Sequence, residues 1–151
     1  MFHVALYEPE IPPNTGNIAR LCAATGTRLH IVGATGFRID DRAVKRAGLD
    51  YWEEVDLVTH IEITDLYETL ADSRFVFFST KARIPYTDWK FKEGDCLVFG
   101  PETRGLPAEI LENNIARSLK IPMSNPRVRS LNLATSVGIC LYEAIRQTGT
   151  P

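Results

Sequence analysis

The sequence lacks the residue patterns of metal sites, redox sites and membrane spans. Its three cysteines, Cys22, Cys96 and Cys140, lie far apart and form no Cys-x-x-Cys pair, the spacing that binds zinc or performs redox chemistry. No apolar run approaches the ~20 residues of a membrane helix, and residues 1–7 read as a strand without the basic flank of a signal peptide. We therefore expect a cytoplasmic protein with reduced, mostly buried thiols, no membrane association and no bound metal.

The chain also lacks internal repeats, low-complexity tracts and a large excess of charge of either sign. Its 151 residues are 44% hydrophobic and 24% charged, with a formal net charge of −2, which is the composition of an ordinary globular protein. We expect one domain over residues 1–151. The charge excludes a strongly basic nucleic-acid-binding domain, so local basic clusters would have to hold any nucleic acid.

Two such clusters are present, and we take them as candidate nucleic-acid-binding residues. In the first, three basic residues fall at i, i+3 and i+4 of a predicted short helix and so share a face. Taken alone, this cluster is also compatible with a solvated helix face. The residues are Arg38, Arg42, Lys45 and Arg46 in the first cluster, and Arg127 and Arg129 in the second.

Strand-like apolar runs alternate with helical patterns along the chain. Strands are predicted near residues 2–7, 28–32, 74–79, 95–99 and 118–121, and helices near residues 15–25, 40–47, 64–71, 107–113 and 131–147. This alternation predicts an α/β fold with a mostly parallel sheet and helices on both faces. Ligands of such sheets bind beyond the carboxyl ends of the strands.

A glycine-punctuated loop, residues 100–107, follows the apolar run that ends at Phe99 and leads into a helix predicted to open near Pro107. Its two glycines would let backbone amides approach a ligand closely, and Glu102 and Arg104 place opposite charges at its mouth. The Gly-x-x-x-x-Gly spacing matches half of a P-loop, but Leu106 and Pro107 replace the Lys and Ser or Thr that bind phosphate and magnesium. A nucleotide triphosphatase is excluded, while an ordinary strand-to-helix turn stays open.

Two further polar segments, residues 8–17 and 122–132, also follow predicted strands and should lie at the same edge of the sheet. In the first, prolines stiffen the chain and Asn14 or Thr15 is expected to cap the next helix. Together with the Gly100 loop they offer amides, arginines and one carboxylate. That mixture suits a polar ligand with a flat base and a phosphate or ribose.

The first predicted helix buries one face and leaves Arg20 on the other. Ile18, Leu21, Cys22 and Thr25 share a stripe at i, i+3, i+4 and i+7. At 100° per residue, Arg20 lies opposite this stripe and faces either water or a ligand.

The last predicted helix is apolar over about 160° of its circumference, and Ile139 and Tyr142 lie outside even that arc. One core contact would not use so much apolar surface. We therefore predict a homodimer that packs on the C-terminal helix.

Three segments of the chain resemble the three motifs of the SPOUT methyltransferases. They are Asn14 to Arg20, Phe99 to Pro107, and Ile121 to Met123 with Arg129 to Ala134. Within that family the chain is most similar to the small TrmL (YibK) type, the tRNA wobble-position ribose 2′-O-methyltransferases, from about Leu6 to Gln147. The early segment Tyr7 to Pro13, and the lack of an appended RNA-binding domain, favour this type over larger ribose methyltransferases.

The resemblance implies a C-terminal deep trefoil knot, which the hydrophobic periodicity alone does not predict. It also implies an S-adenosylmethionine site in the walls of the knot, with S-adenosylhomocysteine as the product and no metal. Carried over by position, the cofactor-binding residues are Phe78, Ser79, Thr80, Gly100, Ile121, Met123, Ser130 and Leu131.

The resemblance implies four catalytic residues. The arginine that matches Arg20 is proposed as the base in related enzymes, but a guanidinium normally stays charged. A second interpretation is that Arg20 binds the substrate phosphate and stabilises the forming alkoxide. Asn14 would orient the ribose or phosphate, Glu102 would position Arg20 or the substrate, and Asn132 would support the site. None of the three histidines lies in the motifs, so we expect them to be structural or exposed.

The implied activity is methyl transfer to the ribose 2′-hydroxyl of the wobble nucleotide, cytidine or uridine at position 34, of tRNA, with leucine tRNAs as the expected substrates. Methylation of another RNA nucleotide remains an alternative, as does a non-catalytic RNA-binding module. A dinucleotide-dependent oxidoreductase would need Gly-x-Gly-x-x-Gly after the first strand, where the chain has Glu8 to Pro13. Binding of S-adenosylmethionine would separate the enzyme from the RNA-binding module.

Overall fold

The computed structural model describes residues 1–39, 42–47 and 49–149, without the side chains of residues 43, 45, 47, 49 and 50. Its centre is a seven-stranded sheet in the order β3-β2-β1-β6-β4-β7-β5, and every strand pair is parallel. The predicted parallel sheet is confirmed. The strands are β1 (His3–Tyr7), β2 (Arg28–Val32), β3 (Leu57–His60), β4 (Phe75–Phe78), β5 (Ile84–Pro85), β6 (Cys96–Phe99) and β7 (Ser118–Lys120).

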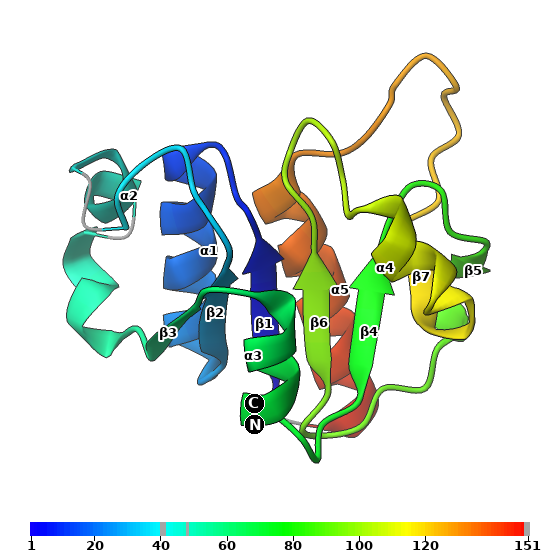
Figure 1. Ribbon diagram of the computed structural model, residues 1–151, viewed down its shortest axis with the longest axis horizontal. Helices are drawn as coiled ribbons and strands as arrows, with labels where there is room; N and C mark the ends of the chain where they lie inside the picture. The colour runs from blue at the N-terminus through cyan, green and yellow to red at the C-terminus, as the bar shows by residue number, and fades with distance from the viewer. Residues whose placement is uncertain (40–41, 48, 150–151) are drawn as a thin grey trace.

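The helices cover both faces of the sheet (Figure 1), with α1 and α5 on one face and α3 and α4 on the other. Short 3-10 turns occupy several of the connections between them. The α-helices are α1 (Pro12–Thr25), α2 (Arg42–Ala47), α3 (Ile63–Thr69), α4 (Ala108–Glu112) and α5 (Leu133–Thr148), and the 3-10 helices are η1 (Leu49–Glu54), η2 (Tyr86–Asp88) and η3 (Ile115–Arg117).

Each predicted strand and helix is present within a few residues of its expected ends, although residues 40 and 41 of the predicted helix 40–47 lie outside the described part. Two strands were missed. β3 is only partly buried, and β5 has two residues, one of them Pro85. Proline cannot donate to the hydrogen-bond ladder and is confined to edge strands, which is where β5 lies.

Neighbouring residues of the central strands pack into the hydrophobic clusters on opposite faces of the sheet. Val4 and Leu6 of β1 pack under α1 and α5, whereas Ala5 packs with Phe77 and Val98 under α3 and α4. Because both faces are covered, these strands are apolar at nearly every position. The three cysteines are free and buried, as expected, and burial raises the pKa of the Cys22 thiol to about 12. Within the described ranges, no helix is long and apolar enough to cross a membrane.

Helix α1 begins earlier than predicted and is capped differently. Pro12 and Pro13 form its first positions, and its N-cap, Ile11, makes no side-chain cap. Proline suits this place because the first helical amides have no partner within the helix. The prediction that Asn14 or Thr15 caps the helix is therefore wrong. The helix ends as expected at Gly26, whose φ of 64° is left-handed.

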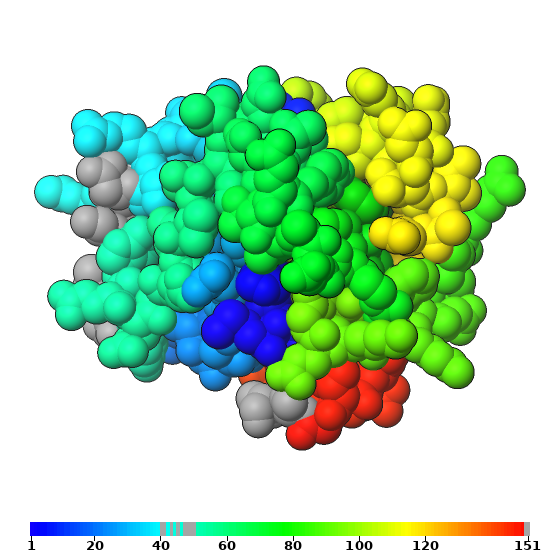
Figure 2. Space-filling view, turned by 60° about the horizontal axis from the view of Figure 1, so that its bottom comes forward, coloured from blue at the N-terminus to red at the C-terminus, as the bar shows by residue number. Residues whose placement is uncertain are grey.

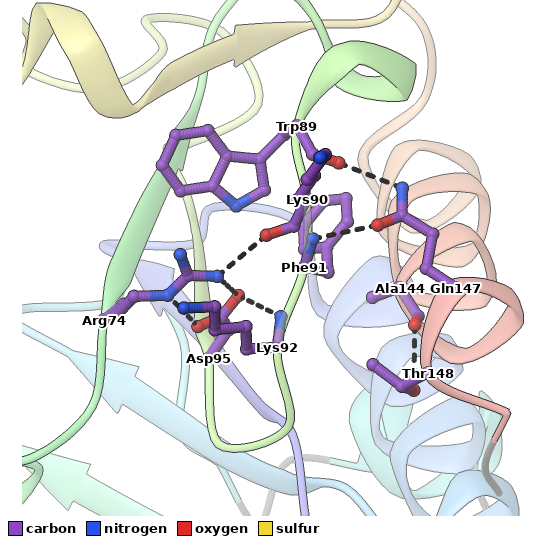
Figure 3. A network of polar contacts seen from close by, with 9 residues as sticks. All are labelled: Arg74, Trp89, Lys90, Phe91, Lys92, Asp95, Ala144, Gln147 and Thr148. Carbon is purple, nitrogen blue, oxygen red and sulfur yellow. Dashed lines mark hydrogen bonds and ion pairs between the residues drawn. The ribbon is translucent and has the colours of Figure 1, made fainter.

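At the amino ends of the strands, a polar network fastens the segment before β6 to α5 (Figure 3). Arg74 donates two hydrogen bonds of 2.8 and 2.6 Å to Asp95 and one of 2.9 Å to the Lys90 carbonyl. The side chain of Gln147 accepts from the Phe91 amide and donates to the Trp89 carbonyl, both at 2.9 Å.

Figure 2 shows the same edge from outside, with the first residues of the chain beside the segment before β6 and the C-terminal helix nearby. The N-terminal amine lies 2.8 Å from Glu93. At the amino ends of the strands, contacts thus join the start, the middle and the end of the chain.

Candidate functional site

A cavity of about 600 Å³ lies beyond the carboxyl ends of β4, β6 and β7. At its base the rings of Phe78 and Phe99 stack, with centroids 4.6 Å apart and planes 5° from parallel. Its walls come from the loops at the top of Figure 1 that follow these strands, and from the start of α5. All the predicted cofactor-binding residues line this one cavity: Phe78, Ser79, Thr80, Gly100, Ile121, Met123, Ser130 and Leu131.

Gly100 is required by the loop that it opens. A Cβ at this position would overlap the backbone of Gly105 and the amide nitrogen of Leu106, because the loop folds back onto its own start. Gly105 has a φ of 69°, a conformation that favours glycine. The sequence pattern located the loop correctly, but close packing within the loop already explains Gly100 without a ligand.

Glu102 anchors the start of α1. Its carboxylate accepts hydrogen bonds of 2.9 Å from the Glu10 amide, 2.6 Å from the Ile11 amide and 3.3 Å from the Asn14 side chain. It therefore ties the residues that lead into α1 to the distant Gly100 loop, and a negative charge at this end of a helix is favourable. Glu102 was predicted to position Arg20 or the substrate. Its carboxylate forms no ion pair with Arg20 and instead binds Glu10, Ile11 and Asn14, so the role toward the substrate stays a prediction.

Asn14 and Asn132 continue this network to α5. The Asn132 side chain donates to Asn14 Oδ1 at 3.1 Å and accepts from the Thr135 amide at 3.2 Å, as the N-cap of α5. Asn14, which is 8% exposed, thus bridges Glu102 and Asn132. The structure brings these three predicted catalytic residues together at the wall of the cavity.

Arg20 lies apart from them. It is exposed on α1, and its guanidinium carbon stands 4.9 Å from the centre of the Tyr51 ring, a cation–π contact. It does not line the cavity, and it forms no ion pair with any side chain that the structure describes. The prediction that Arg20 faces away from the core is confirmed.

A second pair of contacts joins the same two loops and was missed from the sequence. Glu10 accepts hydrogen bonds of 2.8 Å from the amide and 2.8 Å from the hydroxyl of Thr103, and these bonds lower the pKa of Glu10. Nearby, Arg104 lies 3.6 Å from Glu8. Glu10 and Thr103 are 93 positions apart, so no local pattern could have paired them.

The predicted basic residues divide between the cavity and the far side of α1. Arg129 lines the cavity mouth, and Arg127 is exposed on the same segment. Arg38, Arg42 and Arg46 are exposed on or before α2, which packs against α1. The side chain of Lys45 lies outside the described part of the chain. Arg104, which was expected at the mouth of the Gly100 loop, and Lys81, which was not predicted, also line the cavity and are exposed.

The histidines lie outside the cavity, in a row across three neighbouring strands. Nδ1 of His3 is 3.1 Å from Nε2 of His30, and Nδ1 of His30 is 2.9 Å from Nε2 of His60. The pKa of His30 is lowered to about 3, chiefly by burial and in addition by the neighbouring histidines and Arg28. These are structural neutral imidazoles, as expected. Among the described residues no cluster of His, Cys, Asp and Glu could hold a metal ion.

Comparison with known proteins gives consistent results over the whole chain. The model of the SpoU rRNA Methylase family matches residues 1–142. A tRNA (cytidine(34)-2'-O)-methyltransferase of Escherichia coli (strain K12) is 47% identical over 152 aligned residues, which cover 100% of this chain and 96% of that protein.

Two solved structures share the fold. One, described as "Structural insights into the 2-OH methylation of C/U34 on tRNA", has a TM-score of 0.92 and 49% identity, covering 97% of this chain and 95% of that one. The other, an AdoMet-bound rRNA methyltransferase from Sinorhizobium meliloti, has a TM-score of 0.85 and 27% identity, covering 96% of this chain and 56% of its own.

Proposed function

The chain belongs to the SpoU rRNA methylase family, and from this premise we propose that it transfers the methyl group of S-adenosylmethionine to the ribose 2′-hydroxyl of nucleotide 34 of tRNA. The observation that carries the proposal is that residues of all three sequence motifs line one cavity. The full-length similarity to a tRNA (cytidine(34)-2'-O)-methyltransferase supports the substrate. We expect cytidine and uridine to be accepted, leucine tRNAs to be the substrates, and the reaction to take place in the cytoplasm.

The cavity fits S-adenosylmethionine, which supplies an electrophilic methyl group when bound. The stacked pair Phe78 and Phe99 offers an apolar base for the adenine. Ser79, Thr80 and Ser130 add hydroxyl groups at the walls, and the loop from Gly100 adds backbone groups. Its volume of about 600 Å³ is that of a small-molecule site.

We propose that the chain accelerates an in-line displacement mainly by holding the two reactants in alignment. Asn14 and Asn132 are fixed by each other and by Glu102, so they can orient the ribose without rearranging. Arg20, which keeps its charge, would bind the substrate phosphate and stabilise the forming alkoxide. A role for Arg20 as the base would require that charge to be lost.

The mechanism makes Arg20 necessary for turnover and unnecessary for cofactor binding. Arg20→Ala should abolish methylation while binding of S-adenosylhomocysteine, measured by calorimetry, stays within about twofold. Arg117→Ala is the matched control, because Arg117 is exposed on η3 and does not line the cavity. Methylation by the Arg20→Ala variant would contradict both roles of Arg20.

We propose that the active form is a homodimer that packs on α5. The inner face of this helix is buried, but Leu133, Ala134 and Ile139 are only partly buried and Tyr142 is 51% exposed. Helix α5 lies beside α1, so the proposed interface borders the helix that carries Arg20. Sedimentation at micromolar concentration should give twice the mass of the 16.9 kDa chain.

We also propose that the C-terminal segment forms the trefoil knot implied by the SPOUT resemblance. After β7 the chain returns along the carboxyl-end edge of the sheet to α5, which packs against α1 on the other side of β4 and β6 (Figure 1). This return supports a threaded path. It also explains why residues 121–132 can close the cavity from above.

The function is tested by incubating the protein with labelled S-adenosylmethionine and unmodified tRNA and mapping the methylated nucleotide. Label at the ribose of nucleotide 34 is expected, and tRNAs with cytidine or uridine there would measure the preference. Label elsewhere would favour another RNA nucleotide. RNA binding without cofactor binding would favour a non-catalytic module.

The basic residues should contribute through phosphate contacts. Affinity for tRNA is then expected to fall as salt rises, and to fall further when Arg42 and Arg46, which are exposed, are replaced by alanine together with Lys45. Removing Arg127 and Arg129 tests the second cluster separately. An affinity indifferent to both changes and to salt would contradict the RNA-binding assignment.

A further inference from the structure

Glu10 has no assigned role in the proposed chemistry, yet it is one half of a reciprocal contact between two loops of the site. The backbone amide of Glu10 donates to the Glu102 carboxylate at 2.9 Å. The backbone amide of Thr103 donates to the Glu10 carboxylate at 2.8 Å. Each carboxylate therefore binds the backbone of the segment that carries the other, an arrangement that we call the Glu10–Glu102 clasp.

The Glu10 side of the clasp is made through Thr103. Both carboxylate oxygens of Glu10 accept from the Thr103 hydroxyl, at 2.8 and 3.0 Å, and one of them also accepts from the Thr103 amide. Hydrogen bonds to an ionised acceptor are stronger than those between neutral groups. These bonds keep the pKa of Glu10 below its usual value, so the carboxylate is ionised at neutral pH.

A third acidic residue braces the same pair of loops beside the clasp. Glu8 has a φ of 46°, an uncommon conformation for a residue other than glycine. Its carboxylate lies 3.6 Å from Arg104. The side chain of Glu8 also packs so closely on Gly33 that a Cβ there would lie 2.8 Å from its Cγ. Strained backbone of this kind persists where the surrounding contacts require it.

The clasp lies between the two parts of the proposed reaction. The loop from Gly100 to Leu106 forms one wall of the cavity, where the cofactor would bind. The segment that contains Glu10 leads directly into α1, which carries Arg20. A change at the clasp would therefore shift the cofactor wall relative to the helix of the proposed catalytic arginine.

We infer that Glu10 is a positioning residue, which acts through Thr103 to hold the cofactor-binding loop against the start of α1. The inference rests on the proposed function, and it adds a residue that none of the motifs assigned. Glu10 has no place among the residues that line the cavity, so its effect on the reaction is indirect. Its removal should weaken cofactor binding by loosening the wall.

The first test measures S-adenosylhomocysteine binding by calorimetry and the KM for S-adenosylmethionine, at a temperature well below unfolding. Glu10→Ala should weaken binding about tenfold and raise KM in proportion, with a smaller change in kcat. Glu10→Gln should restore part of the affinity, since its amide oxygen still accepts from Thr103. Glu68→Ala is the control, because Glu68 is an exposed glutamate on α3 outside the cavity.

Thr103 provides the test of the route. Thr103→Val removes the hydroxyl bonds to Glu10 and keeps the amide bond, so it should weaken binding less than Glu10→Ala, and Thr103→Ser should be near wild type. Added to Glu10→Ala, Thr103→Val should have no further effect, because residues that act through one contact are not additive. Unchanged binding by Glu10→Ala, or fully additive effects, would overturn the inference.

Hydrogen exchange separates this inference from the proposed function. In the protein without ligand, Glu10→Ala should accelerate exchange of the amides in residues 100–107, while Glu68→Ala should not. A wild-type protein that binds no S-adenosylmethionine would overturn the proposed function. Exchange in residues 100–107 that Glu10→Ala leaves unchanged would overturn the positioning role, whether or not the cofactor binds.

Discussion

Two networks, each centred on a carboxylate, lie at opposite ends of the strands of the same parallel sheet, and they differ in what surrounds them. At the amino ends, Asp95 is 1% exposed and its carboxylate is bound by Arg74 and by the backbone amide of Lys92 (Figure 3). At the carboxyl ends, Glu102 is half-buried and its partners border a cavity of about 600 Å³. Both networks join segments that are distant in the sequence.

The difference indicates which network serves stability and which serves the site. A buried carboxylate that loses its partner is costly, so the Asp95 network stabilises the fold as a closed unit. The Glu102 network makes its hydrogen bonds on the side that faces the start of α1, and its opposite side borders the cavity. This network can hold the wall of the cavity in place because its own hydrogen bonds are already made. Substitutions at the two edges should therefore have different effects.

The largest loss of stability is expected for Asp95→Ala. The change leaves Arg74 without its partner and the Lys92 amide without its acceptor, and should lower the free energy of unfolding by about 3 kcal/mol. Denaturant unfolding measures it. Binding of S-adenosylhomocysteine by the folded variant should match wild type, and a selective loss of that binding would contradict the division between the two edges.

Glu102→Ala should have a smaller effect on stability and a much larger one on the site. It removes two hydrogen bonds from backbone amides before α1 and one from the Asn14 side chain, and loss of hydrogen bonds to a charged group should cost about 2 kcal/mol. Cofactor affinity and turnover should fall together, because the loop and Asn14 both lose their anchor. A variant that loses stability but keeps normal turnover would make Glu102 a structural residue like Asp95.

Gln147→Ala tests the link between the amino-end network and the C-terminal helix. Its side chain joins the Phe91 amide and the Trp89 carbonyl to α5, and the loss of these neutral hydrogen bonds should cost about 1 kcal/mol. Glu68→Ala is the control, since Glu68 is exposed on α3 and a substitution at such a surface position should change stability little. Equal destabilisation by the two variants would contradict the role of Gln147 as a clamp.

Much of this arrangement could be predicted from the sequence, because the central strands are buried on both faces and read as apolar runs. β1, β2, β4 and β6 are of this kind. β3 was missed since it is only partly buried, and β5 because two residues carry no periodicity. The hydrophobic pattern thus located the strands that form the core.

The predictions for the site, like those for the strands, were partly correct. The Gly100 loop was placed correctly from the strand pattern, because parallel strands bring their carboxyl ends together, and Ser79 was placed at the same cavity by the family resemblance. The partners of polar side chains were not. Glu102 was expected to position Arg20 or the substrate, its bonds to the amides of Glu10 and Ile11 were not foreseen, and Glu10 was overlooked. Pairing across about ninety positions depends on the folded geometry and leaves no local pattern.

A separate expected effect is a pH dependence of stability that arises in neither network. The folded pKa of each of His3, His30 and His60 lies below the usual 6.5, chiefly because of burial. Below pH 6.5 the unfolded chain therefore binds protons that the folded chain does not. Stability is fully present above that pH and should decline as pH falls from 7 towards 5, by about 1 kcal/mol per pH unit for each proton.

Denaturant unfolding at a series of pH values measures this slope, and His30→Gln isolates the central histidine. The charges that act on the row are those of Arg28, Asp56, Asp65 and the N-terminal amine. His30→Gln should flatten the decline because it removes the most strongly shifted group, whereas Gln147→Ala should lower stability equally between pH 5 and 7. A slope that Gln147→Ala alters and His30→Gln does not would place the pH-sensitive group at the amino-end edge instead of in the histidine row.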